Sequence, residues 1–187
     1  MDRLLVNAGP IAHMSGDGPI VGPIVDESDF VYPPGLGILV EDYTIKKIAD
    51  SEELVSEFSS VDVIDLEGKA IVPGLVDSHT HLLWAGDRSR EVAWKQKGMS
   101  YRQIAENGGG IAATVIPTRN ASDSELAHLG IERMRKALRN GTTHMEAKSG
   151  YGLTLEDEIK SLEVIKKINS NLELDILPTF LGAHAVP

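Results

Sequence analysis

The spacing of apolar residues changes near residue 70. Before that point, short apolar runs alternate with turn residues, which is typical of strands. These runs cover residues 4–7, 37–40, 44–48, 61–65 and 70–72, with a hairpin expected around Glu41-Asp42. Residues 15–37 are rich in Gly and Pro and are predicted to form a long loop. We therefore expect residues 1–70 to form a small all-β module.

After residue 70 the pattern predicts strands at residues 75–83, 142–147 and 174–181, the last of them largely apolar. Helices are expected between them, a short one over residues 100–107 and two longer ones that begin after Ser122 and Thr154. Ser122 and Glu125 have the spacing of a capping box, and Asn140-Gly141 ends that helix. The alternation of strands and helices predicts a parallel sheet.

Apolar residues recur at helical spacing in both longer segments. The first apolar face comprises Ala127, Ile131, Met134 and Leu138, and the second comprises Leu155, Ile159, Leu162, Ile165 and Ile168. We expect these two faces to cover the sheet.

Charge and composition narrow the classes of partner. The 187 residues carry a formal net charge of −10, and no basic run offsets it, so nucleic acid and anionic membranes are not expected partners. Cysteine is absent, so any metal must be held by His, Asp or Glu. No apolar stretch resembles a signal peptide or approaches the ~20 residues of a membrane span. These features favour a cytoplasmic protein.

One run, Pro73-Gly74-Leu75-Val76-Asp77-Ser78-His79-Thr80-His81, concentrates the candidate chemistry. His79 and His81 are two positions apart, and the period of a strand places both imidazoles on one face. At the carboxyl end of a strand such a pair can bind Zn²⁺ or iron. A bare pair of histidines is more often structural, but the Pro-Gly-x-x-Asp context favours the metal site.

This run, with Gly68 to Val72 before it, resembles the first-strand signature of the amidohydrolase superfamily. Three later segments are similar to the imidazolonepropionase family, and together the resemblance covers almost the whole chain. These segments are Asn107-Gly108-Gly109-Gly110-Ile111, Glu146-Ala147-Lys148-Ser149-Gly150-Tyr151-Gly152-Leu153 and Thr179-Phe180-Leu181-Gly182-Ala183-His184-Ala185-Val186-Pro187.

The resemblance implies an α/β fold in which residues 71–187 form the first three strands of a (β/α)8 TIM-like barrel. Residues 1–70 would form the amino-terminal part of a β-sandwich subdomain. The implied reaction is metal-dependent hydrolysis of 4-imidazolone-5-propanoate to N-formimidoyl-L-glutamate in histidine degradation. One zinc or iron ion would be bound by His79 and His81. The implied substrate-binding residues are Arg88, Tyr101, Tyr151 and His184.

The positions of these residues agree with the implied roles, since each follows a predicted strand and such loops share one face of a barrel. Arg88 could bind the substrate carboxylate through two parallel hydrogen bonds. It could equally face solvent, Tyr151 could pack a loop, and His184 could cap a strand. Lys148 is interpreted as structural. The glycine run at residues 108–110 lacks the ending of a phosphate-binding loop, so a tight turn is expected.

The family takes its third histidine ligand, a metal-binding aspartate and the acid/base glutamate from later strands. We therefore expect a truncated chain that is inactive alone and contains no catalytic acid or base. The alternatives are another amidohydrolase acting on a heterocyclic amide or amine, and a non-catalytic fragment. The expected partner is a small-molecule substrate. A homodimer is possible.

Overall fold

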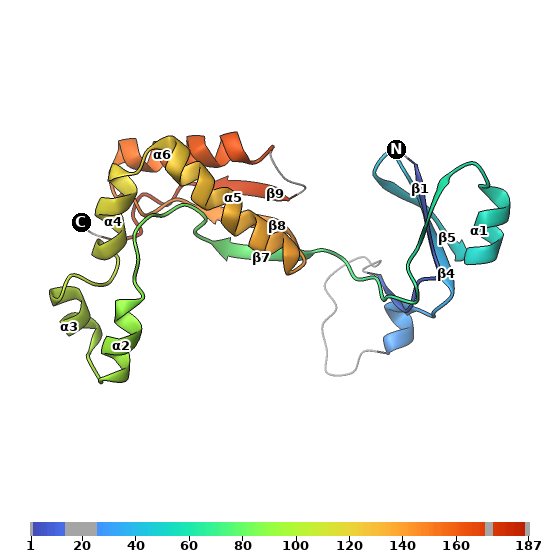
Figure 1. Cartoon of the computed structure of the whole chain (residues 1–187), viewed down its shortest axis with the longest axis horizontal. Helices are drawn as coiled ribbons and strands as arrows, with labels where there is room; N and C mark the ends of the chain where they lie inside the picture. Colours follow the sequence, from blue (N-terminus) through green and yellow to red (C-terminus); the bar gives the residue numbers. More distant parts are fainter. Residues whose placement is uncertain (1, 14–25, 171–173, 186–187) are drawn as a thin grey trace. The chain divides into compact units, whose positions relative to one another are not determined.

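The computed structural model describes residues 2–13, 26–170 and 174–185 (Figure 1). The chain is mixed α/β and divides into two compact units, Met1–Pro73 and Gly74–Pro187. Among the described residues, every helix falls short of the length and apolarity needed to cross a membrane.

The first unit is built on a four-stranded sheet with the order β5-β4-β1-β6. The strands are β1 Arg3–Val6, β4 Leu36–Glu41, β5 Thr44–Asp50 and β6 Asp62–Asp65. β1 pairs antiparallel with β4 and parallel with β6, and β4 pairs antiparallel with β5 as the predicted hairpin. A second, two-stranded sheet joins β2 Ile11–Ala12 to β3 Val31–Tyr32, just after the 3-10 helix η1 Glu27–Asp29.

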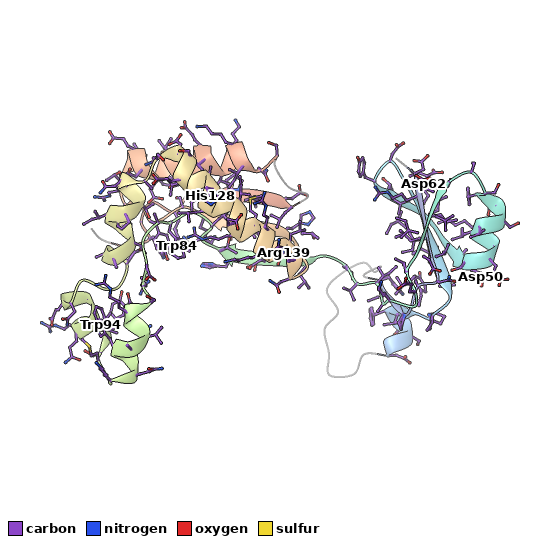
Figure 2. All side chains as sticks on the ribbon, in the orientation of Figure 1. Asp50, Asp62, Trp84, Trp94, His128 and Arg139 are labelled. Carbon is purple, nitrogen blue, oxygen red and sulfur yellow. The ribbon has the colours of Figure 1, made fainter. Side chains whose placement is uncertain are left out.

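The prediction of an all-β module is wrong, because helix α1, Ser51–Glu57, packs on the sheet. Asp50 caps this helix by accepting hydrogen bonds from the backbone N–H groups of Glu52 and Glu53 (Figure 2 labels Asp50). Leu54 on its inner face is fully buried. Seven residues provide too few apolar positions for a helical period to stand out.

Two other expectations for this unit need correction. Residues 70–72 form no strand, and only an isolated bridge joins Ile71 to Ile11. The predicted loop contains η1, β3 and the start of β4, while its residues 15–25 lie outside the described part of the chain.

The second unit contains the predicted parallel sheet, in the order β7-β8-β9. Its strands are β7 Leu75–Thr80, β8 Thr142–Lys148 and β9 Asp175–Thr179. The parallel arrangement is confirmed, but β7 ends three residues earlier than expected, at Thr80. The consecutive residues Leu82 and Leu83 are both buried. A strand sends neighbouring side chains to opposite faces, so the chain must leave the strand before this point.

Five helices belong to this unit among the described residues: α2 Arg90–Gln96, α3 Tyr101–Glu106, α4 Ala112–Asn120, α5 Asp123–Arg139 and α6 Leu155–Ile168. The predictions of α3, α5 and α6 are confirmed, together with the capping box of Ser122 and Glu125 and the cap at Thr154. The sequence did not predict α2 or α4. α2 begins without a side-chain cap, and α4 contains Pro117.

Helices α5 and α6 cover one face of the β7-β8-β9 sheet (Figure 1). The core between them contains Leu82, Leu83, Leu126, Met134, Met145, Ala147, Val164, Ile165, Ile168, Leu174 and Ile176. The predicted apolar face of α6 is partly wrong, because Leu155 and Ile159 are exposed. Glu158 and Ser161 are buried in their place, so the inner face of the helix is rotated towards them.

Among the described residues of this unit, no helix covers the opposite face of the sheet (Figure 1). Val76 and Leu177 on this side are 71% and 68% exposed. They line a hollow of about 610 Å³ together with His144 and Glu146. The sheet therefore has one packed face and one open face.

Candidate active site

The two histidines of the sequence motif lie close together at the carboxyl end of β7. His79 is within the strand and His81 follows directly after it. Their ring centroids are 5.8 Å apart, with an edge-to-face angle of 74°. The strand period predicted that the two rings would be neighbours, and the structure brings them together.

His81 also contacts aromatic side chains from the loops that follow the other two strands. Its ring stacks on His184 with centroids 4.4 Å apart, and its centroid is 5.1 Å from that of Tyr151. Tyr151 and His184 lie edge to face at 5.5 Å. The structure therefore brings His81, Tyr151 and His184 together, because the carboxyl ends of parallel strands share one edge of the sheet.

Backbone geometry fixes the His184 ring. Its Nδ1 lies 2.9 Å from the carbonyl oxygen of Gly150, and since a carbonyl only accepts, Nδ1 is the donor. In a neutral ring, Nε2 is then left as an acceptor. Gly150 has φ of 122°, and a Cβ there would lie 2.8 Å from that of His184. Only glycine tolerates both this backbone conformation and this close approach.

The environment of His81 suits a metal ligand. Burial, followed by the neighbouring His184 and His79, lowers the pKa of its imidazole below the ordinary value. The ring is therefore neutral at pH 7, which is the form that binds metals. Its Nδ1 is buried and has no hydrogen-bond partner of good geometry in the described part of the chain, while the backbone of Ser149 near the ring partly offsets the fall in its pKa.

These two imidazoles do not make a complete metal site. Within residues 2–13, 26–170 and 174–185, no group of three His, Cys, Asp or Glu side chains is arranged to hold an ion. Catalytic zinc usually has about three protein ligands. The residues present fit part of such a site.

Arg88 follows β7 in the chain and is partly buried rather than facing solvent freely. Its Nε and Nη2 atoms donate to the two carboxylate oxygens of Glu91, at 2.7 and 2.8 Å. This ion pair raises the pKa of Arg88, with smaller contributions from Tyr151 and Tyr101. Arg88 and Tyr151 line one cavity of about 440 Å³, so a ligand there can touch both.

Tyr101 is less closely tied to the other candidates. It begins α3, and its side chain is 70% exposed. A Cβ added to Gly110 would lie 3.6 Å from the Tyr101 hydroxyl, so the phenol lies over the glycine turn. No ring contact in the described regions joins Tyr101 to the histidines.

Arg133 of α5 supports the segment after β7, and the sequence did not reveal it. Its guanidinium donates to the carbonyl oxygens of Leu82 and Trp84, at 2.7 and 2.9 Å. It also lies 3.9 Å from the centroid of the Trp84 ring (Figure 2 labels Trp84). About fifty residues separate these partners in the chain, so no local pattern could indicate the contact.

Lys148 has a structural partner, as its interpretation anticipated. It forms an ion pair with Glu146 on the same strand, and Thr179 of β9 donates to the same carboxylate at 2.8 Å. Lys148 followed by Thr179 lowers the pKa of Glu146. Glu146 thus links β8 to β9 through Thr179, and Lys148 is engaged by the same carboxylate.

Two curated relatives are similar to nearly all of this chain. The imidazolonepropionase of Symbiobacterium thermophilum is 42% identical over 100% of the chain, which spans 44% of that protein. The imidazolonepropionase of Brevibacillus brevis is 41% identical over 97% of the chain, and again 44% of the relative is covered. The chain thus spans less than half the length of these relatives, and it matches their amino-terminal part.

Solved structures agree on the fold. Zinc-complexed atrazine chlorohydrolase TrzN from Arthrobacter aurescens TC1 has a TM-score of 0.53 and 13% sequence identity. The match covers 95% of this chain and 35% of that one. At this identity the likeness concerns the fold alone.

A family model, described as the amidohydrolase family, matches residues 62–155. This span is half of the chain and runs from β6 through the histidine pair to the first residue of α6. Together with the ring cluster at the ends of three parallel strands, it shows that the chain belongs to the amidohydrolase family.

Proposed function

We propose that this chain is the amino-terminal part of a metal-dependent cyclic-amide hydrolase that converts 4-imidazolone-5-propanoate to N-formimidoyl-L-glutamate in histidine degradation. The observation that carries the proposal is the cluster of His79, His81, Tyr151 and His184 at the ends of β7, β8 and β9. Two relatives named imidazolonepropionase, at 41–42% identity over almost the whole chain, support this reaction. A cytoplasmic location would suit it.

The architecture we propose is a (β/α)8 barrel whose first three strands are β7, β8 and β9. The parallel order of these strands supports it, as do the helices on one face and the uncovered opposite face. A barrel of this type needs about 250 residues, and the relatives are longer than this chain. The first unit, roughly residues 1–70, would contribute strands to a β-sandwich.

His79 and His81 are the proposed ligands of one zinc or iron ion. Their closeness and the unpartnered, buried Nδ1 of His81 support this role. When bound, the ion supplies Lewis acidity that activates water as a nucleophile near neutral pH. The zinc in the related TrzN structure is a property of that protein and is consistent with the donor type here.

The other four candidates are proposed to bind and orient substrate. Arg88 has the charge and geometry for the propanoate carboxylate. Tyr151 lines the same cavity and also touches His81, so it lies between the carboxylate-binding end and the metal-binding end of the site. With Nδ1 committed to Gly150, Nε2 of a neutral His184 would accept a hydrogen bond from the heterocycle. Tyr101 would close the site from α3.

The chain contains no group that we assign as the general acid or base. Ring opening requires a proton at the leaving nitrogen, and that donor would come from the part of the longer relatives that this chain does not span. We therefore expect the 187-residue chain alone to show no measurable turnover, even with added Zn²⁺ or Fe²⁺.

A chimera tests the proposal. This chain replaces the matching 44% of the Symbiobacterium thermophilum relative. Ring opening of freshly prepared imidazolone propanoate is followed with added Zn²⁺ or Fe²⁺. We expect turnover by the chimera and its loss in His79→Ala and His81→Ala variants. Metal content, measured on the same preparations, should fall with the activity.

Three results would contradict the proposal. A folded, metal-loaded chimera that leaves this substrate intact would exclude the reaction. Turnover of another heterocyclic amide or amine from a substrate panel would identify a different amidohydrolase. Activity of the isolated chain that is lost on His79→Ala would mean that copies of the chain complete one another's sites.

A further inference from the structure

Glu91 is a buried carboxylate surrounded by donors. It is only 5% exposed, which is rare for glutamate unless it is paired. Arg88 donates to both of its oxygens, and the backbone N–H of Gly110 donates to Oε1 at 2.7 Å. Three charge-assisted hydrogen bonds therefore fix this one side chain.

The glycine run at residues 108–110 contributes the backbone donor to Glu91. Gly110 has φ of 69°, which suits glycine, and its N–H points to Glu91. A Cβ on Gly109 would lie 2.6 Å from the Cγ2 atom of Ile104 and 3.2 Å from Glu91 Oε1. The run is thus a tight turn, as expected, and it lets the backbone approach a carboxylate of the protein itself.

The ion pair determines which edge of Arg88 remains available. Nε and one Nη2 hydrogen are used by Glu91, and no other acceptor in the described part of the chain bonds to this guanidinium. Nη1 and the second Nη2 hydrogen form the terminal edge, which offers two roughly parallel donors. Arg88, Glu91, Lys95 and Tyr151 line one cavity, and a carboxylate bound there could pair with this free edge of Arg88.

We propose that Glu91, held by the glycine turn, is a positioning residue that presents the terminal edge of Arg88 to the substrate carboxylate. The inference rests on the proposed function and deepens it, because it names the group that orients the carboxylate-binding arginine. Glu91 also lines the cavity, but an anionic side chain would repel the substrate carboxylate, so it would act through Arg88. Its effect should therefore be confined to ligands that carry a carboxylate.

The first test uses this 187-residue chain and needs no turnover. The Nε–Hε resonance of Arg88 is followed by NMR while 3-(imidazol-4-yl)propanoate, a stable carboxylate probe, is added to millimolar concentration. We expect a slowly exchanging Arg88 signal that shifts with the probe but not with the corresponding carboxamide. In Glu91→Gln the signal should exchange rapidly and lose its response to the probe.

The second test uses the chimera. Glu91→Gln should raise KM for imidazolone propanoate about tenfold or more with little change in kcat, since a misplaced arginine weakens ground-state and transition-state binding alike. For the carboxamide analogue, wild type and variant should have the same KM. Glu91→Asp keeps the charge and should recover part of the loss.

Glu106→Gln is the matched control. It makes the same chemical change in an Arg–Glu pair, Arg102 to Glu106 at 2.8 Å, but both side chains are well exposed. It should leave the Arg88 signal, the probe response and KM unchanged.

The outcomes separate the two proposals. Equal KM increases for the carboxylate and carboxamide substrates in Glu91→Gln would reduce Glu91 to a structural role and overturn the inference. The inference would also be overturned if the Arg88 Nε–Hε resonance of the wild-type chain did not shift when the probe is added. A chimera that turns over nothing, while the Arg88 response to the probe persists and depends on Glu91, would instead reject the proposed reaction and leave the positioning role in place.

Discussion

At the scale of single residues, the guanidinium of Arg88 has two donor edges. One edge of the guanidinium donates to Glu91, and the other has no acceptor in the described part of the chain. Lysine keeps the charge but has one compact ammonium group, so it cannot bond to both partners with the same planar geometry. Substitution at this position should therefore separate substrate binding from metal binding.

We expect Arg88→Lys in the chimera to raise KM for imidazolone propanoate by about tenfold or more and to leave the bound metal unchanged. Steady-state kinetics and metal analysis on the same sample provide the check. Arg90→Lys, on a nearby exposed arginine, is the control and should match wild type. Unchanged KM and kcat in Arg88→Lys would remove this residue from the site.

Local sequence patterns predicted the positions of the histidines and Tyr151, but they did not predict the role of Glu91. The strand period placed His79 beside His81, and position after a strand brought Tyr151 and His184 to the same edge. The role of Glu91 depends on Gly110, nineteen residues further along the chain. A glutamate in a polar stretch reads as a solvated side chain, and only the folded turn shows that it is buried.

At the scale of elements, α4 and α6 hold the loop that presents Tyr151. Glu158, in the first turn of α6, is fully buried and accepts hydrogen bonds from the backbone N–H groups of Gly152 and Leu153, at 2.8 and 2.7 Å. Arg119 of α4 donates to the Gly152 carbonyl at 2.6 Å. A loop rich in glycine is thus fixed at several backbone groups.

We expect Glu158→Ala to destabilise the second unit by about 2–4 kcal/mol, because one buried and one partly buried N–H group lose their carboxylate acceptor. Urea unfolding of the chain measures this change. Glu156→Ala, in the same helical turn but exposed, should cost only about 0.5 kcal/mol or less. Equal losses for the two variants would show that the hydrogen bonds to the loop contribute little.

The longer helices α5 and α6 were predictable because capping residues marked where each begins and apolar residues recurred at helical spacing within each. Ser122 with Glu125 marked the start of α5, and Thr154 marked the start of α6. The inward turn of Glu158 was not visible, since a charged residue in a first helical turn is usually explained by the helix dipole. Glu158 and Ser161 occupy the inner face of α6, which is why the prediction that Leu155 and Ile159 face the core is wrong.

At the scale of the whole molecule, one face of the β7-β8-β9 sheet carries no helix of its own unit among the described residues. Leu177 and Glu146 are paired in register, as are Thr179 and Lys148, so apolar and charged side chains share this face. In the barrel that we propose, later strands would enclose it. In the chain alone, the exposed apolar residues favour association between copies.

We expect the isolated chain to associate as its concentration rises, and Leu177→Glu to weaken that association. Sedimentation velocity across a concentration series gives the measurement. The substitution should barely affect folding stability, because the side chain is already 68% exposed. Ile116→Glu, on a residue that is 64% exposed in α4, is the control and should associate like wild type. A monomer at all concentrations would contradict the prediction.

The contact between Arg133 and Trp84 also allows the segment after β7 to be followed by tryptophan fluorescence. The chain has two tryptophans, Trp84 and Trp94. Replacing Trp94 with phenylalanine would leave Trp84 as the only indole emitter, with a guanidinium 3.9 Å from its ring. Its emission wavelength and quenching would then report when this segment detaches from α5, at a point three residues from His81.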